Sequence, residues 1–168
     1  MVGKTFKSIL IFLLIGTLLT ACSGNQSGSG DQTGSIDPGI TVEEMVTKLM
    51  EVNEQPMLAE MESDLVESLY HLNPELLEEY AIRYPLINIK TNEVAVLKVK
   101  DSKDIATVEE AVRQRAEDVQ KTFENYLPDQ YENAMNYKLV TKGQYIMFAI
   151  CEDSDKLETT FNDFFTDK

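Results

Sequence analysis

Apolar and polar residues are arranged along the chain in three different patterns, and each predicts a different kind of segment. Residues 8–19 form one compact apolar run, whereas residues 23–39 are almost entirely small and polar. From residue 40 onward, apolar residues recur every three to four positions, as on one face of a helix, or gather in short β-rich runs. The pattern therefore predicts an apolar N-terminus, a polar tether and one folded domain over residues 40–168.

The domain contains several segments with the apolar spacing of amphipathic helices. Thr41 and Glu44 have the spacing of a capping box at the start of the first helix. Leu127-Pro128 ends the longest one, because proline cannot continue a helix. The expected helices are one that Thr41 caps, a second over 62–72 with a further turn over 75–79, a long one over 103–126, a short helix or turn around 129–134, and a last one from Asp153 or Ser154.

Two pairs of β-rich runs predict two hairpins. Pro85 lacks an amide hydrogen, so its strand is expected to lie at a sheet edge or to hold a bulge. Apolar residues on both faces of residues 94–99 place that strand near the middle of the sheet. The expected strands are 80–90 and 93–100, separated by Thr91-Asn92, and 136–140 and 144–150, joined through Lys142-Gly143.

The order of these elements is helices, hairpin, helix, hairpin, helix. Hairpins that are segregated in this way predict an α+β fold, with a small antiparallel sheet from two β-hairpins packed against helices.

The N-terminus has the pattern of a bacterial lipoprotein signal. Lys4 and Lys7 precede the apolar run, which is too short to cross a bilayer core of about 20 apolar residues. Leu19-Thr20-Ala21-Cys22 resembles the lipobox, in which the cysteine carries a diacylglyceryl group and becomes the new N-terminus. We expect a signal peptide over 1–21, and a lipidated Cys22 with a flexible Gly/Ser-rich tether over 22–39. The alternative is an ordinary signal peptide with a cysteine near its cleavage site by chance.

This pattern predicts a protein held on the outer face of the cytoplasmic membrane by the lipid on Cys22. The formal net charge of the chain is −14, and removal of residues 1–21, which hold two lysines and no acid, makes it −16. Nucleic acid is therefore not expected as a partner, because phosphates require a basic surface. An anionic membrane surface also repels such a domain.

Few residues of the domain have the spacing of a catalytic or metal site. His71 is the only histidine, and no HExxH, GxSxG or glycine-rich phosphate loop is present, so no metal or cofactor is expected. Glu152, Asp153, Asp155 and Glu158 lack the ligand order of a calcium loop and suit a helix start. Cys151 ends the apolar run QYIMFAIC, so we expect a buried residue in preference to a reactive thiol.

One group of residues suggests a binding surface. Tyrosine and proline at a helix end can border a shallow surface, because the aromatic ring packs below while its hydroxyl group hydrogen-bonds above. They can equally fix the long helix to the hairpin that follows, and we favour this structural role. The group consists of Tyr126, Pro128, Gln130, Tyr131 and Tyr145.

The stretch from NEVAVLKVKD to GQYIMFAICED resembles an uncharacterised group of lipoproteins from Gram-positive bacteria, the domain-of-unknown-function family 4358. The resemblance rests on Asn92-Glu-Val-Ala95, Lys100-Asp101, Arg115, Tyr126-Leu-Pro-Asp-Gln-Tyr131 and Gly143-Gln-Tyr145. It covers about residues 57–164. The family implies a location and a fold, but no reaction.

These observations together predict a non-enzymatic, lipid-anchored module that binds a protein partner or takes part in an envelope assembly. The alternative is an envelope enzyme, such as a hydrolase that uses a pair of carboxylates. Carboxylate pairs leave almost no spacing signal, and the domain contains many acids.

Overall fold

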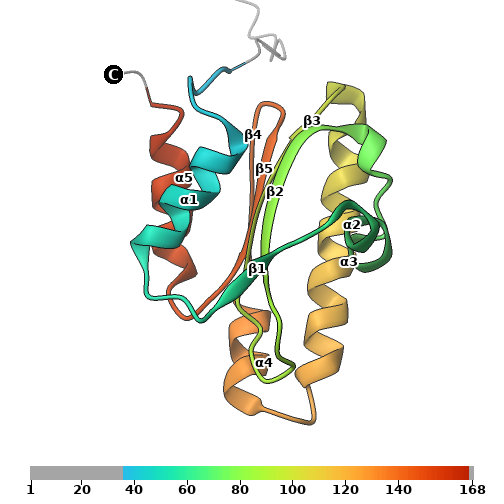
Figure 1. The fold of residues 1–168 in the computed structure, drawn as a ribbon, viewed down its shortest axis with the longest axis vertical. Coiled ribbons are helices and arrows are strands. Elements are labelled where there is room, and N and C mark those ends of the chain that lie inside the picture. Colours follow the sequence, from blue (N-terminus) through green and yellow to red (C-terminus); the bar gives the residue numbers. More distant parts are fainter. Residues whose placement is uncertain (1–35, 167–168) are drawn as a thin grey trace, which may run out of the picture. The chain divides into compact units, whose positions relative to one another are not determined.

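The computed structural model describes residues 36–166, and these form an α+β fold, as predicted (Figure 1). Residues 1–35, with the predicted signal peptide, Cys22 and most of the tether, lie outside the described residues. The α-helices are α1 (Val42–Val52), α2 (Ser63–Tyr70), α3 (Ile105–Phe123), α4 (Pro128–Met135) and α5 (Ser154–Asp163), and the strands are β1 (Leu58–Glu60), β2 (Leu77–Pro85), β3 (Glu93–Val99), β4 (Lys138–Lys142) and β5 (Tyr145–Ile150). Two short 3₁₀ turns, Pro74–Leu76 and Ser102–Asp104, precede β2 and α3.

The five strands form one antiparallel sheet in the order β1-β2-β3-β5-β4. The prediction that residues 94–99 lie in the middle is confirmed, because β3 pairs with β2 on one side and with β5 on the other. Of the two alternatives for the Pro85 strand, the edge position is wrong, whereas a strand that holds a bulge agrees with the register shift in β2. The three-residue strand β1, which the sequence pattern did not reveal, pairs Leu58 with Pro85, so β2 is not an edge strand. The irregularity of β2 lies at its other end, between Leu77 and Glu79.

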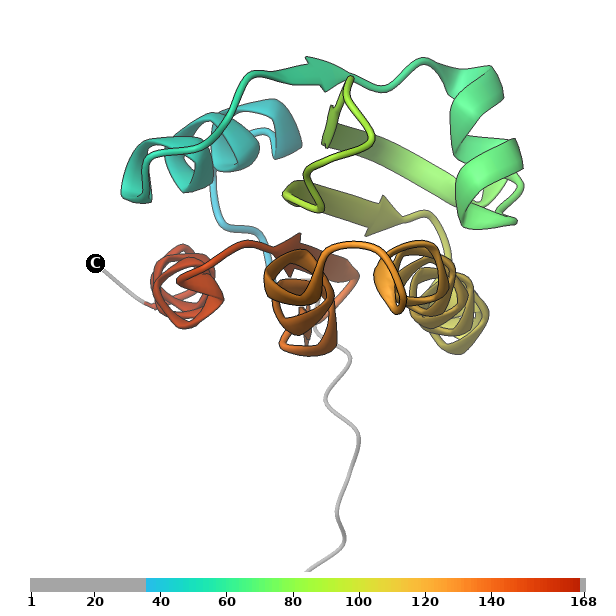
Figure 2. The ribbon, with the colours of Figure 1, turned by 90° about the horizontal axis from the view of Figure 1, so that it is seen from below.

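Helices cover both faces of the sheet (Figure 2). One apolar core lies between the sheet and α1 and α5, and contains Val94, Val96 and Met147. The second core lies between the sheet and α2, α3 and α4, and contains Ala95, Leu97 and Phe148 among others. Alternate residues of β3 enter the two cores in turn, which explains why this strand is apolar on both faces.

Local hydrogen bonds set the helix boundaries. The capping box of α1 is confirmed: the Glu44 amide donates to Thr41 Oγ1 at 3.2 Å, and the Thr41 amide donates to Glu44 Oε2 at 2.8 Å. The predicted long helix ends earlier than expected, at Phe123, because the amides of Tyr126 and Leu127 turn back to the Phe123 carbonyl. A separate helix then starts at Pro128, where the missing amide hydrogen costs nothing.

The two ends of the sheet differ in which loops they carry. The β4–β5 turn contains Gly143, with φ of 57°, and a Cβ atom at this position would lie 3.7 Å from Ile36. This end, where the described chain begins, is called the tether end. The β2–β3 connection, residues 86–92, lies at the opposite end of β3, where Glu93 faces Ile150 (Figure 1). We call this second end the loop end.

None of the helices between residues 36 and 166 has the length and apolar character needed to cross a bilayer.

Candidate functional site

The residues of the predicted tyrosine group do not all lie together. Tyr126 follows α3, is 55% exposed, and its ring lies 6.2 Å from that of Phe123. Pro128, Gln130 and Tyr131 belong to the adjacent helix α4. Tyr145 is buried in the other core, on the opposite face of the sheet, where its ring lies 5.4 Å from that of Phe165. The structure therefore brings four of the five residues together at the α3–α4 junction.

Gln130 is the buried member of this group, and it connects α4 to the β2–β3 connection. Its side-chain oxygen accepts a hydrogen bond from the Thr91 amide at 3.0 Å, and its carbonyl oxygen accepts one from the Thr91 hydroxyl at 3.3 Å. Both side chains are almost fully buried. Residues 86–92 are therefore a longer connection held by α4. The predicted hairpin of these two strands is confirmed, but the first strand ends at Pro85 and not at residue 90, so the break is wider than Thr91-Asn92.

Next to Thr91, three side chains form a buried ionic cluster. Glu93, the first residue of β3, is 1% exposed and accepts hydrogen bonds from Arg115 Nη2 at 2.6 Å and Arg115 Nε at 3.1 Å. The Tyr70 hydroxyl donates to the same carboxylate at 2.5 Å. The Arg115 guanidinium also lies over the Tyr70 ring, 5.8 Å from its centre. The cluster links α2, α3 and the central strand.

Within this cluster, the positive charge of Arg115 neutralises the negative charge of Glu93. Burial first, and the charge of Glu93 second, raise the pKa of Tyr70 well above its ordinary value, so its phenol remains a donor. Burial alone would lower the pKa of Arg115, but the charge and hydrogen bonds of Glu93 raise it. Glu93 thus accepts three hydrogen bonds, two of them from a fixed cation, and this arrangement suits a structural link better than proton transfer.

Exposed apolar side chains gather at the loop end of the sheet. Met57 and Leu86 are the neighbours in sequence of the paired residues Leu58 and Pro85, and they are 85% and 64% exposed. Ile87 and Ile89 follow, and are also exposed. We call Met57, Leu86, Ile87 and Ile89 the apolar rim. Such a group of large apolar side chains in contact with water is typical of an interaction site.

A hollow of about 250 Å³ lies between this rim and α3. Leu86 and Ile87 line one side of it, and Val119 and Phe123 line the other. Glu93 and Arg115 also reach its surface. Tyr126 packs near Phe123, so the exposed residue of the predicted tyrosine group lies close to this hollow.

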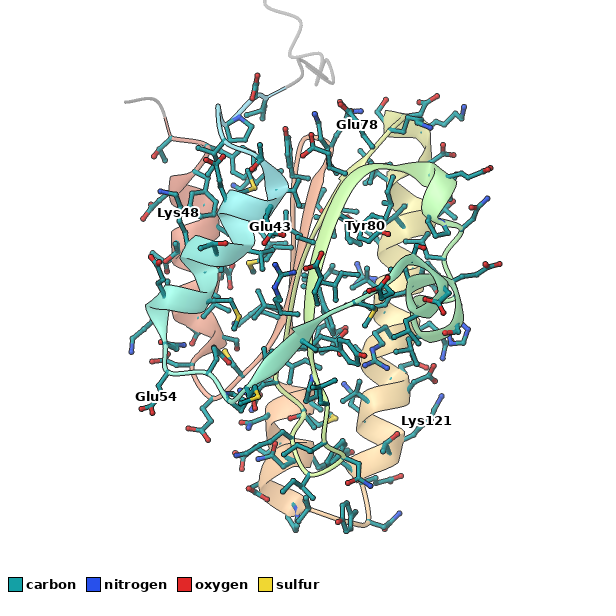
Figure 3. All side chains as sticks on the ribbon, viewed as in Figure 1. Glu43, Lys48, Glu54, Glu78, Tyr80 and Lys121 are labelled. Atoms are coloured by element: carbon teal, nitrogen blue, oxygen red, sulfur yellow. The ribbon has the colours of Figure 1, made fainter. Side chains whose placement is uncertain are left out.

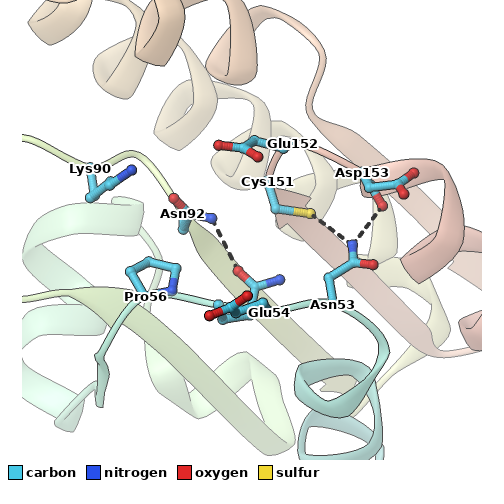
Figure 4. A pocket seen from close by; sticks show the side chains of 9 residues that line it. Asn53, Glu54, Pro56, Lys90, Asn92, Cys151, Glu152 and Asp153 are labelled. Atoms are coloured by element: carbon cyan, nitrogen blue, oxygen red, sulfur yellow. Dashed lines mark hydrogen bonds between the residues drawn. The ribbon is translucent and has the colours of Figure 1, made fainter.

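A second, polar hollow of about 460 Å³ lies on the other side of the β2–β3 connection (Figure 4). Three irregular segments line it: residues 53–56 after α1, Lys90 with Asn92, and residues 151–153 after β5. The side-chain nitrogen of Asn92 donates to Gln55 Oε1 at 3.0 Å, and the side-chain nitrogen of Asn53 donates to the backbone carbonyl of Asp153 at 3.0 Å. The Gln55 side-chain nitrogen is buried without a hydrogen-bond partner among the described residues, which is typical of a position where a water or ligand supplies the acceptor.

Cys151 lies in the wall of the polar hollow and is 3% exposed, which confirms its predicted burial. Its sulfur lies 3.9 Å from the amide nitrogen of Asn53. Burial raises the pKa of the Cys151 thiol, so at neutral pH the sulfur keeps its proton and is a poor nucleophile.

We therefore expect Cys151 to react with iodoacetamide about a hundredfold or more slower in the folded chain than in urea, because both burial and the raised pKa oppose thiolate attack. The measurement is alkylation followed by mass spectrometry in a Cys22→Ser variant, where Cys151 is the sole thiol. Equal rates in the folded and the unfolded chain would contradict this interpretation.

The other candidates from the sequence have local partners. His71 is half-exposed at the end of α2, with φ of 53°, and its Nε2 lies 2.8 Å from Asp118 Oδ2. The acids around the start of α5 form ion pairs: Asp155 and Glu158 with Lys138, and Asp153 with Lys156. Asp153 stands at the N-cap position of α5 but makes no side-chain capping bond. Within residues 36–166, no three or more His, Cys, Asp or Glu side chains are grouped so that they could bind a metal ion.

The fold and its contacts define a class of protein: a small α+β domain, with a five-stranded antiparallel sheet between two helical layers and an exposed apolar rim at one end. The chain belongs to the family described as Domain of unknown function (DUF4358), whose model matches residues 50–151. This range begins within α1 and ends before α5, so it starts earlier and stops sooner than the resemblance suggested. Comparisons with curated proteins and with solved structures found no match.

Sequence reasoning did not find the apolar rim, the polar hollow or the link between Glu93 and Arg115. Leu86, Ile87 and Ile89 were assigned to a strand, where an alternating pattern would place some of them inside. Glu93 at the start of an apolar strand was a signal for a buried charge, but its partner lies 22 residues away on α3. Only the fold brings the two together.

Proposed function

We propose that this chain is a lipid-anchored, non-enzymatic module on the outer face of the cytoplasmic membrane, where it binds a protein partner of the envelope through the apolar rim. The observation that carries the proposal is the exposure of Met57, Leu86 and Ile87 beside a hollow at the loop end. The lipobox at Leu19–Cys22 supports the anchor.

The position of the rim suits an anchored protein. The chain enters the domain at the tether end of the sheet, and the rim lies at the opposite end. The rim is therefore remote from the point at which the chain enters the domain. The strongly acidic composition of the chain favours a partner whose contact surface is apolar at its centre and basic at its border.

The alternative, a carboxylate-dependent hydrolase, needs a carboxylate that is free to take a proton or attack a substrate. Glu93 is the buried carboxylate at the hollow, and it already accepts hydrogen bonds from Arg115 and Tyr70. This arrangement supports the binding module over the hydrolase.

The proposal predicts position-specific crosslinking in intact cells. A photo-crosslinking amino acid at Ile87, in the rim, should capture one reproducible protein, because the partner covers this side chain. The matched control carries the same amino acid at Lys48, which projects from the outer face of α1, away from the sheet (Figure 3). Mass spectrometry of the adducts identifies the captured protein.

A second variant tests whether the rim itself provides the affinity. With the crosslinker moved to Ile89, the double substitution Leu86→Ser and Ile87→Ser should reduce the adduct about tenfold, as expected when an interface loses its central apolar residues. Binding through the rim is ruled out if the crosslinkers at Ile87 and Lys48 capture the same proteins. It is also ruled out if the Ile89 adduct persists in the double variant.

A further inference from the structure

The polar hollow is lined by charged side chains that form no ion pair among the described residues, although, after the hydrogen bond from Gln130, the positive charge of Lys90 helps to lower the pKa of Asp129. Lys90, Glu54 and Glu152 all line it. None of the three makes an ion pair with another residue in the range 36–166. Figure 4 shows Lys90 to the left of Asn92, Glu152 to its upper right and Glu54 below it. One cation and two anions that form no ion pair within residues 36–166 thus line a single hollow.

Between these charged side chains lie two uncharged ones, Asn92 and Gln55, which a hydrogen bond holds together. The hydrogen bond from Asn92 Nδ2 to Gln55 Oε1 fixes both carboxamides. It uses the nitrogen of Asn92 and leaves its side-chain oxygen without a donor among the described residues. That oxygen is an acceptor for an ammonium or a peptide N–H. The volume of about 460 Å³ lies within the range of small-molecule sites.

The charges discriminate between classes of ligand. An apolar ligand would remove water from Lys90 and the glutamates without replacing their hydrogen bonds. A polyanion would be repelled by Glu54 and Glu152, and a simple cation would leave Lys90 unused. A zwitterion satisfies both signs, because its carboxylate can pair with Lys90 while its ammonium pairs with a glutamate or with the Asn92 oxygen.

We propose that the polar hollow is a binding site for a zwitterionic amino acid or short peptide. Lys90 binds the carboxylate, Glu152 and Glu54 bind the ammonium, and Asn92 accepts a hydrogen bond from a ligand N–H. This site is separate from partner binding at the apolar rim. Lys90 also borders the α3 hollow, whereas Glu152 lines only the polar hollow, so Glu152 is the residue that distinguishes the two.

The test uses L-alanyl-L-alanine as the probe and the full chain in a non-ionic detergent, whose headgroup carries no charge that could compete for the hollow. Saturation-transfer NMR should show the bound dipeptide, with affinity weak enough for fast exchange. Two matched probes lack one charge each: the N-acetylated dipeptide and the dipeptide amide. Each should bind about tenfold more weakly than the parent, since each loses a charge-assisted hydrogen bond.

Protein variants locate the site. Glu152→Gln should weaken dipeptide binding while leaving the Ile87 crosslink intact, and Lys90→Met should also weaken it. The matched controls Glu110→Gln, on α3, and Lys48→Met, on α1, replace exposed residues away from the hollow and should bind as the unmodified chain does. The proposal is overturned if 10 mM dipeptide gives no saturation transfer. It is also overturned if the N-acetylated dipeptide and the dipeptide amide bind as well as the parent, or if Glu152→Gln and Lys90→Met bind the dipeptide fully.

Discussion

Replacing Arg115 with methionine is expected to lower the free energy of unfolding by about 3–5 kcal/mol, the cost of breaking a buried ion pair by removing one partner. Methionine retains the apolar stem of the side chain but leaves the carboxylate of Glu93 without its cation. That carboxylate is 1% exposed and is therefore largely desolvated in the folded chain. Tyr70 alone would remain as a donor to it. Urea denaturation followed by circular dichroism measures the loss.

The same helix supplies a matched control. Arg113 lies two positions earlier on α3, is half-exposed, and its Nη2 lies 3.6 Å from Glu109. Arg113→Met should therefore cost about 1 kcal/mol or less, as is usual for a surface ion pair. The double variant Glu93→Gln with Arg115→Met should recover part of the loss, because it removes both charges. If Arg115→Met and Arg113→Met cost the same, the buried pair does not support the fold.

This cluster shows what a sequence pattern can and cannot reveal about a site. Arg115 was noted only as part of a family resemblance, and its position on α3 was correctly predicted. Its partner could not be predicted, because helix periodicity places a residue on a face but does not say which strand that face covers. The 22 residues between Glu93 and Arg115 carry no spacing rule of their own. The contact depends on how α3 packs across the sheet.

The elements with strong periodicity were the most predictable. The capping box at Thr41, the central position of β3 and the start of α5 at Ser154 all follow from local patterns that tertiary contacts do not override. The strand β1 has only three residues, too few for an alternating pattern. Its pairing with β2 also explains why the edge position expected for the Pro85 strand is wrong, because Pro85 is the last residue of β2 and its missing amide hydrogen affects only the end of the ladder.

The loop end was mispredicted for a physical reason. Residues 86–89 are as apolar as a strand, and Thr91-Asn92 has the composition of a turn. Tertiary hydrogen bonds override both signals. Thr91 is bound by Gln130 and Asn92 by Gln55, so the polar pair is buried while the apolar residues are exposed. A reversal of the usual pattern at one end of a domain is the feature that most favours an interaction surface there.

The proposed lipid anchor predicts that labelled palmitate is incorporated only when Cys22 is present. Cys22→Ala should abolish incorporation of labelled palmitate, because the thiol is the atom proposed to carry the diacylglyceryl group. The expected loss of membrane affinity is large: each buried methylene contributes about 0.8 kcal/mol, and two acyl chains together hold a protein stably where one does not. The measurement is fluorography of the immunoprecipitated chain after metabolic labelling.

The second cysteine is the matched control for this experiment. Cys151→Ala should keep the full label, because Cys151 is 3% exposed inside the domain, where no acyl transfer enzyme can reach its sulfur. Label that persists in Cys22→Ala would show that the lipid is attached elsewhere, and a chain that never takes up palmitate would remove the anchor from the proposal. In the latter case partner binding would still be tested by the crosslink at Ile87, since the apolar rim lies on the folded domain and does not depend on how the tether is held.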